Sequence, residues 1–194
     1  MSKPLAAVKP RPRFGIRALC RIAVMTALYL PLARLAIEIG TVKLSLGSLP
    51  VTVLALLTGP VEAALAAALG ELLKQMLTYG FTATTLLWII PPALRGLLIG
   101  LAAARLWRTE RPLEERPVRC YAVGMGAAVV TTVANCLPLW LDSVIYDYYF
   151  PGYILGSLVA RLGVGIATAL IVAILAMSVV PALRRQGLGR EVRP

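Results

Sequence analysis

The sequence contains no histidine, and its three cysteines, Cys20, Cys120 and Cys136, are far apart along the chain. Neither a paired-cysteine spacing nor a His/Cys ligand pattern is present, so the sequence predicts no disulfide framework and no zinc site. It also lacks a glycine-rich phosphate loop, a nucleophile elbow and a carboxylate cluster suited to a metal ion. We therefore predict no catalytic residue, no metal and no cofactor, and do not expect an enzyme.

Charged side chains are scarce. They make up 15% of the 194 residues, whereas hydrophobic residues make up 59%, and the mean hydropathy is +0.80. A soluble domain of this size needs a more polar surface. Backbone groups within a bilayer must be hydrogen-bonded inside the fold, and the long apolar runs do not alternate as barrel strands do. The composition therefore predicts an all-α integral membrane protein.

The formal net charge of +11 does not indicate a nucleic-acid partner. The cations form short clusters between apolar runs, not the continuous basic stripe of a nucleic-acid surface. Such clusters are typical of the cytoplasmic loops of membrane proteins. The basic N-terminus resembles the start of a signal peptide, but no small-residue cleavage pattern follows it. We therefore predict a retained first helix in a lipid bilayer.

A membrane-spanning helix needs about 20 apolar residues, and this length divides the chain into about six transmembrane helices. They are expected from about Cys20 to Ile39, from Leu49 to the Thr58-Gly59-Pro60 turn, from Val61 to about Leu77, from Leu86 to Arg105 and Arg108, from about Cys120 to Leu141, and from Ile154 to about Val180. Residues 40–48 are expected to form a short extended lid. The predicted organisation is a basic segment 1–19, one membrane domain 20–183 and a basic tail 184–194.

The arginine-rich connections all fall on one side of this arrangement, which predicts that both termini are cytoplasmic. The opposite loops contain most of the tyrosines, and Lys43 is their one cation. Two interpretations of the tyrosines in the last of these loops stay open, an aromatic belt at the membrane interface or contact with a ligand. These tyrosines are Tyr146, Tyr148, Tyr149 and Tyr153.

Two ionisable residues, Glu71 and Arg95, are expected near the middle of the membrane. Each such group costs about 2.5–3.5 kcal/mol to insert, so it usually faces a cavity or a partner. The favoured interpretation is an ion pair between the two side chains. The alternative is that Arg95 forms the base of a pocket and binds an anionic group of a substrate.

Other polar and aromatic residues gather toward the outer ends of the predicted helices. A pocket lined in this way suits a flat, anionic, water-soluble molecule. For any single one of these residues, helix–helix contact or snorkelling is an equally good explanation. The candidate substrate-binding residues are Arg34, Lys43, Lys74, Gln75, Tyr79, Thr84, Thr85, Trp88, Arg95, Asn135, Trp140 and Arg161. At the inner side, Ala23 and Ala27 form a small-residue face on which another helix can pack.

The stretch from Thr41 to Leu101 carries a family resemblance. It contains a lysine and a serine before SLP, an LLTGP turn, an acidic residue in LGELLK, and a GF-T-x-T segment that leads to RGLLIG. In these features the chain resembles the substrate-binding S components of energy-coupling-factor vitamin transporters, the folate type most closely.

The resemblance implies six helices, cytoplasmic termini, and a vitamin pocket near the outer face, roofed by the first and third outer loops. It also implies a multi-pass protein of the bacterial cell membrane, with a transmembrane coupling protein and two ATPase subunits as partners. Ala23 and Ala27 match the face that docks on the coupling protein. The chain departs from the folate type at Glu71, at Lys74-Gln75 and in WIIPPALRG, so a substrate other than folate stays open.

Two other classes of protein are alternatives to this interpretation. A non-catalytic scaffold of the cell-envelope machinery also has short helices and basic loops, but it predicts no ligand pocket. An intramembrane transferase acting on lipid head groups needs an Asp-rich metal or phosphate site. Asp142 and Asp147 are too few for such a site, and both lie in one outer loop.

Overall fold

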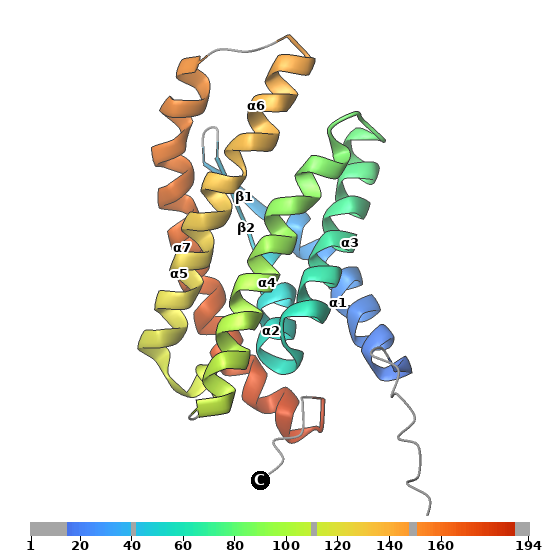
Figure 1. Cartoon of the computed structure of the whole chain (residues 1–194), viewed down its shortest axis with the longest axis vertical. Coiled ribbons are helices and arrows are strands. Elements are labelled where there is room, and N and C mark those ends of the chain that lie inside the picture. Colours follow the sequence, from blue (N-terminus) through green and yellow to red (C-terminus); the bar gives the residue numbers. More distant parts are fainter. Residues whose placement is uncertain (1–14, 40–41, 110–111, 148–150, 189–194) are drawn as a thin grey trace, which may run out of the picture.

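The computed structural model describes residues 15–39, 42–109, 112–147 and 151–188. Its elements are α1 (Ile16–Arg34), β1 (Ala36–Ile39), β2 (Val42–Ser45), α2 (Ser48–Thr58), α3 (Pro60–Tyr79), α4 (Thr85–Thr109), the 3-10 turn η1 (Leu113–Glu115), α5 (Pro117–Ala134), α6 (Cys136–Ile145) and α7 (Pro151–Arg185). The long helices run beside one another along the long axis of the molecule (Figure 1). With α5 and α6 counted as one broken span, the predicted six-helix membrane architecture is confirmed.

By length and composition, four stretches of the described chain are able to cross a membrane: Ile16–Arg34, Thr85–Leu106, Pro117–Ile145 and Gly156–Arg185. The helix α3 has 20 residues but contains Glu62, Glu71 and Lys74. The helix α2 has only 11 residues and is buried from Pro50 to Thr58. It is therefore a short core helix enclosed by the longer ones.

The predicted end of the first helix is wrong. The helix α1 ends at Arg34, shortly after Pro31, and β1 pairs antiparallel with β2 so that Ala36 lies opposite Ser45. Proline cannot donate a backbone hydrogen bond, and the β-branched residues that follow favour extended structure. Residues 40 and 41 of the predicted extended lid lie outside the described chain, while β2 occupies the part after them.

The predicted fifth helix is broken at Asn135 into α5 and α6. Pro138 lies three residues beyond the break, and it lacks the N–H that would bond to the carbonyl of Ala134 in a continuous helix. At the ends of the bundle, α1 begins at Ile16 and α7 runs to Arg185, so both extend beyond the predicted membrane domain of 20–183.

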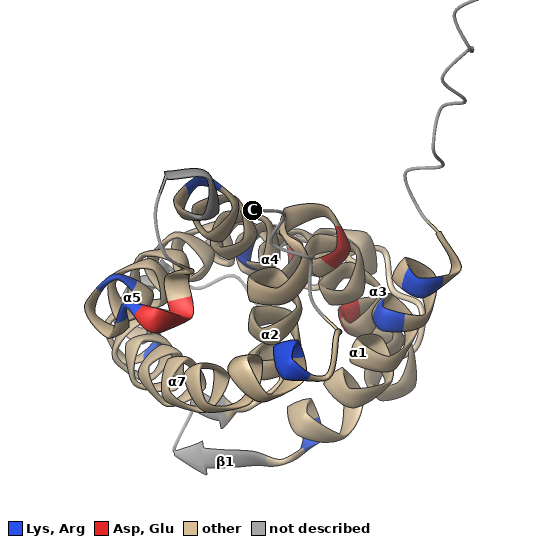
Figure 2. Cartoon of the chain, turned by 90° about the horizontal axis from the view of Figure 1, so that it is seen from below, with Lys and Arg blue, Asp and Glu red and all other residues tan. Residues whose placement is uncertain are grey.

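The end of the molecule at which α1 begins and α7 ends is here called the inner end, and the opposite end the outer end (Figure 1). The hydrophobic core lies toward the inner end and includes Leu54, Leu56 and Leu57 of α2 together with Ala176 and Val180 of α7. Seen from this end, Lys and Arg positions are spread over several helices, including the start of α1 and α5 (Figure 2).

Glycine allows α3 and α4 to approach closely. A Cβ atom added at Gly96 would lie 2.8 Å from the carbonyl oxygen of Ala63, and one at Gly100 would lie 2.4 Å from the Cα of Pro60. The turn between α2 and α3 also requires glycine, because Gly59 has a φ of 107°. Pro60 follows as the first residue of α3, where its missing N–H is tolerated.

An ion pair joins three elements at the inner end. The Nη2 atom of Arg184 on α7 lies 2.9 Å from Oε1 of Glu114 in η1, and it donates a hydrogen bond to the carbonyl oxygen of Leu56 on α2. The carboxyl group of Glu114 is deeply buried, with 3% of its side chain exposed. Burial raises the pKa of Glu114, while the positive charge of Arg184 acts in the opposite direction.

Candidate functional site: a polar cavity

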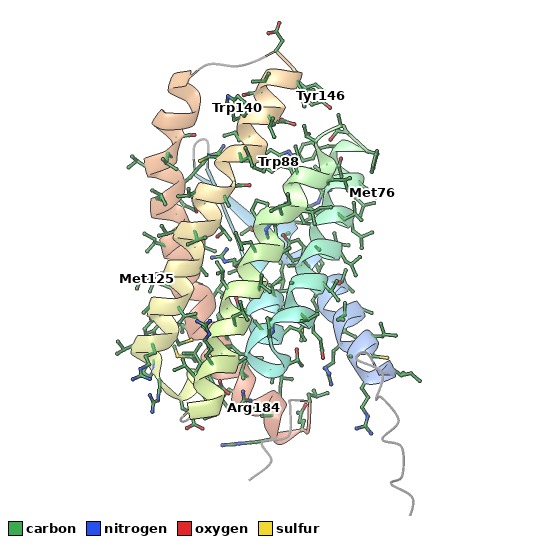
Figure 3. The ribbon with its side chains drawn as sticks, in the orientation of Figure 1. Met76, Trp88, Met125, Trp140, Tyr146 and Arg184 are labelled. Atoms are coloured by element: carbon green, nitrogen blue, oxygen red, sulfur yellow. The ribbon has the colours of Figure 1, made fainter. Side chains whose placement is uncertain are left out.

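A cavity of about 920 Å³ is lined by residues of all seven α-helices and of β2. Its wall includes Trp88 and Tyr146, which lie toward the outer end, far from Arg184 (Figure 3). Small-molecule sites usually measure about 300–1,000 Å³ and combine apolar surface with a few convergent polar groups. Size and lining therefore both agree with a binding site for one small molecule.

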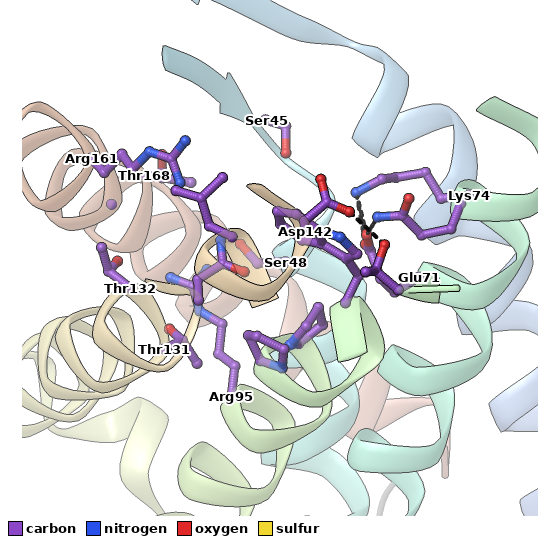
Figure 4. Close-up of a pocket in the computed structure, with 18 of the residues that line it drawn as sticks. Ser45, Ser48, Glu71, Lys74, Arg95, Thr131, Thr132, Asp142, Arg161 and Thr168 are labelled. Carbon is purple, nitrogen blue, oxygen red and sulfur yellow. Dashed lines mark hydrogen bonds and ion pairs between the residues drawn. The ribbon is translucent and has the colours of Figure 1, made fainter. Parts of the chain in front are cut away.

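One wall of the cavity is organised around Glu71 of α3, whose side chain is 4% exposed. The hydroxyl of Tyr29 on α1 donates to its Oε2 at 2.7 Å, and the amide of Gln75 donates to its Oε1 at 2.8 Å. The Nζ of Lys74 lies 2.7 Å from the carboxylate. The three side chains thus donate to one carboxylate. Figure 4 shows Lys74 next to Glu71, and the charges of these two side chains compensate each other.

The favoured ion pair between Glu71 and Arg95 is wrong. Glu71 is bound by Tyr29, Lys74 and Gln75, and the Arg95 side chain makes no hydrogen bond or ion pair with any residue of the described chain. The physical reason is proximity: Lys74 and Gln75 follow Glu71 by three and four residues on the same helix, where side chains meet. Arg95 lies on the cavity wall instead.

The opposite wall is formed by α5 and α7 and is rich in threonine. The hydroxyl of Thr131 donates to the Ala127 carbonyl at 2.6 Å, that of Thr132 to the Ala128 carbonyl at 2.8 Å, and that of Thr168 to the Val164 carbonyl at 2.7 Å. A hydroxyl has one proton, so each of these side chains offers only an acceptor to the cavity. The donors on this wall are the Arg161 guanidinium and the Asn135 amide.

Ring side chains line much of the side of α4 that faces the cavity. Trp88, Pro91 and Pro92 line it, and Leu139 of α6 adds to the same lining. Aromatic and proline side chains provide rigid, flat contact surface at low entropic cost. The two prolines also cannot donate to the carbonyls of residues 87 and 88, so this turn of α4 lacks two of its helical hydrogen bonds.

The structure brings many of the predicted residues together on the cavity wall. The predicted residues that line it are Lys74, Gln75, Tyr79, Thr84, Trp88, Arg95, Asn135 and Arg161. Three others do not line it. Thr85 is buried against Thr82, Arg34 is exposed and bonds to Thr78, and the side chain of Trp140 is 43% exposed. The side chain of Lys43, like Tyr148, Tyr149 and the side chain of Tyr153, lies outside what the structure describes.

Sequence reasoning missed several residues of the wall. These are Tyr29, Ser45, Ser48, Val51, Thr82, Thr131, Thr132, Leu139, Asp142, Val164, Gly165 and Thr168. Tyr146, for which ligand contact was left open, and Pro91 and Pro92 of the WIIPPALRG departure also line the wall. The uncharged hydroxyl residues carry no signal in hydropathy, because threonine is common inside helices. Asp142 could have been found, since it is one of few acids near the outer ends, and it accepts a hydrogen bond from Thr84 at 2.5 Å.

Ala23 and Ala27 lie on a face of α1 that the rest of the chain leaves exposed. The opposite face of the same helix is buried through Ile22, Thr26 and Tyr29. The docking role of the two alanines is not tested by this arrangement and stays a prediction.

The family model for the S component of an ECF-type riboflavin transporter matches residues 13–185. The chain belongs to this family. Its members are substrate-binding subunits of vitamin transporters, and the predicted resemblance to S components is confirmed. The protein is therefore a multi-pass membrane subunit that binds a transported solute, not an enzyme.

Solved structures with the same fold come from S components. A structure of ThiT from Listeria monocytogenes has a TM-score of 0.59 and 19% sequence identity, over 87% of this chain and 95% of that chain. A structure of FolT bound with folic acid has a TM-score of 0.54 and 19% identity, over 91% of this chain and 99% of that chain. Similarity at this identity supports the fold alone. A search of the curated proteins gives no match.

Proposed function

We propose that this S component captures a water-soluble vitamin or a related small molecule from outside a bacterial cell, in the plasma membrane, and delivers it inward. The best candidate is a folate-like compound. A transmembrane coupling protein and two ATPase subunits supply the energy, because the sequence contains no phosphate-binding loop of its own. The arginine-rich segments at the inner end support a cytoplasmic inner end, with the cavity toward the outside.

The observation that carries this proposal is the polar cavity of about 920 Å³ in the outer part of an S-component fold. A non-catalytic scaffold has no use for such a cavity. The size of the cavity, the flat surface at Trp88 and the charged groups around it all suit a compact heterocyclic solute. The proposed substrate-binding residues are those predicted residues that line the cavity.

Ligand binding to the purified protein tests the proposal. The detergent-solubilised chain is screened by thermal shift and native mass spectrometry against water-soluble vitamins and their precursors, folates included. A solute that binds only the folded state raises the unfolding temperature, by mass action. If no solute in the panel binds and no coupling protein or ATPase co-purifies, the scaffold interpretation replaces this one.

Docking through α1 is tested separately from ligand binding. Replacing Ala23 and Ala27 by leucine adds bulk to the exposed face of α1, so we expect loss of co-purification with the coupling protein and unchanged solute binding. Leucine at Val24, on the exposed surface of the same helix, is the matched control. Equal co-purification of all variants would remove the two alanines from the proposed interface.

A further inference from the structure

The charges around the cavity are not balanced. The side chains of Lys74, Arg95 and Arg161 are cationic, and those of Glu71 and Asp142 are anionic. Lys74 and Glu71 form an ion pair and cancel. Among the lining residues that the structure describes, one carboxylate is then left for the two arginines, that of Asp142 on α6, which accepts a hydrogen bond from Thr84.

Neither arginine has a partner of its own within the described chain. The guanidinium groups of Arg95 and Arg161 make no hydrogen bond or ion pair with a described residue. Ten N–H donors in total would be left for the cavity, since each guanidinium carries about five. Cations within a membrane domain are unfavourable unless an anion or water accompanies them. Such an arrangement is expected where a ligand supplies the missing charge.

The surroundings of the two arginines explain why the chain itself does not satisfy them. Figure 4 shows Arg95 reaching from α4 toward the side of the cavity where Thr131 and Thr132 lie. Arg161 and Thr168 of α7 line the same cavity. The threonine hydroxyls already donate hydrogen bonds to backbone carbonyls, so they have no proton left to donate to an anion. They can accept hydrogen bonds from N–H or O–H groups next to the anionic group of a ligand.

We propose that the transported solute is an organic anion, and that Arg95 and Arg161 bind its carboxylate or phosphate on the α4, α5 and α7 side of the cavity. This inference rests on the proposed function and adds the charge and orientation of the substrate. The flat part of the solute lies against Trp88, Pro91 and Pro92. The cluster around Glu71 is electrically neutral and contacts the uncharged part. Guanidinium groups suit this role because they bind carboxylate and phosphate oxygens in pairs.

Binding by solutes of different charge tests the inference. The purified chain is titrated with folate, pantothenate and biotin as anions, riboflavin as a neutral compound and thiamine as a cation. We expect an anion to bind and the neutral and cationic compounds not to. Binding of riboflavin or thiamine in preference to every anion would overturn the anion site while leaving the proposed function intact. If no compound binds, the proposed function fails, and the anion site fails with it.

Variants then locate the anionic group. Arg95→Gln and Arg161→Gln should each weaken binding of the anion roughly 10- to 100-fold, because each removes a charged hydrogen-bond donor from a desolvated site. Arg95→Lys should recover part of the loss, since it restores charge but not the planar pair of donors. Arg17→Gln removes an exposed cation at the inner end and is the matched control, with unchanged affinity.

The stability of the ligand-free variants separates a binding role from a structural one. A cation that the chain does not satisfy is not needed for folding, so Arg95→Gln and Arg161→Gln should unfold at the same temperature as the parent or above it. Only the rise in unfolding temperature that the anion causes should become smaller in these variants. Undiminished binding of the anion in both glutamine variants would overturn the proposal, as would a large loss of stability in the absence of solute.

Discussion

The inner part of this protein is tightly packed, whereas the outer part encloses a cavity. At the inner end, α2 is enclosed by apolar side chains, and α3 and α4 touch through glycine. Arg184 of α7 forms an ion pair with η1 and a hydrogen bond to α2. At the outer end, the same helices separate around a cavity of about 920 Å³ lined by polar groups. Stability is therefore concentrated at the inner end, and the outer end can adapt its shape to a ligand.

The largest loss of stability is expected when a side chain is added at the closest contact between α3 and α4. In Gly100→Ala the new Cβ would lie 2.4 Å from the Cα of Pro60, so α3 and α4 must move apart. Overpacking of this kind lowers the free energy of unfolding by about 3 kcal/mol. We expect a large fall in the unfolding temperature of the detergent-solubilised protein. Gly126→Ala is the control, because nothing lies within 4 Å of its new Cβ; equal stability of the two variants would contradict the packing argument.

Breaking the ion pair between Arg184 and Glu114 comes next. Removing one partner of a buried pair costs about 3–5 kcal/mol, and we expect about 2 kcal/mol for Arg184→Ala because 18% of the Arg184 side chain is exposed. Arg185→Ala, at an exposed position next to it, should have little effect. Thermal or chemical unfolding of both variants measures the difference in stability. An equal loss of stability in the two variants would show that the ion pair does not stabilise the fold.

The same variant has a predictable dependence on pH. Burial raises the pKa of Glu114, and in Arg184→Ala the opposing charge is gone, so the pKa rises further. The folded state then holds its proton more tightly than the unfolded state, and folding is favoured as pH falls through that raised pKa. We therefore expect the stability deficit of Arg184→Ala to shrink on acidification. A deficit that is constant or grows toward low pH would contradict this account.

A smaller effect is expected in the cavity wall. Tyr29→Phe removes the hydroxyl that donates to Glu71 at 2.7 Å, which leaves the carboxylate with Lys74 and Gln75. Loss of one hydrogen bond to a charged group costs about 1.5 kcal/mol. Tyr79→Phe is the control for stability, since the Tyr79 side chain is 66% exposed. If Tyr29→Phe lowers stability more than Arg184→Ala does, the contrast between the two ends is wrong.

The smallest effect is expected at Arg34. Its side chain is exposed and bonds to Thr78 at 2.9 Å, away from the cavity wall. Exposed polar pairs of this kind contribute about 0.5 kcal/mol or less. We expect Arg34→Ala to leave both the unfolding temperature and the affinity for solute nearly unchanged. A tenfold loss of affinity in titration calorimetry would restore Arg34 to the binding site.

The helices could be predicted from the sequence because hydropathy and basic loops report directly on burial in a membrane. What could not be predicted were the interruptions. The strand Ala36–Ile39 is as apolar as the helix before it, and the break at Asn135 lies within a continuous apolar stretch. In both places a proline nearby changes the backbone, and the outcome depends on contacts with distant segments.

The candidate site could be predicted where charge or a large ring made a residue conspicuous, as at Lys74, Trp88, Arg95 and Arg161. The partner of Glu71 was misjudged because matching depths in the membrane are a weaker guide than neighbours on one helix. Thr131, Thr132 and Thr168 were missed because a hydroxyl bonded within its own helix looks like any other helical residue.

The threonines of the wall differ from the Glu71 cluster in how each could change over evolutionary time. Within the described chain, each of the three hydroxyls bonds only to backbone carbonyls of its own helix, so replacing it leaves no partner unsatisfied on another element. Glu71 instead shares its bonds with Tyr29, Lys74 and Gln75. Single substitutions can therefore adapt the threonine wall to a new solute. In the Glu71 cluster, a change at one residue requires compensating changes at the others.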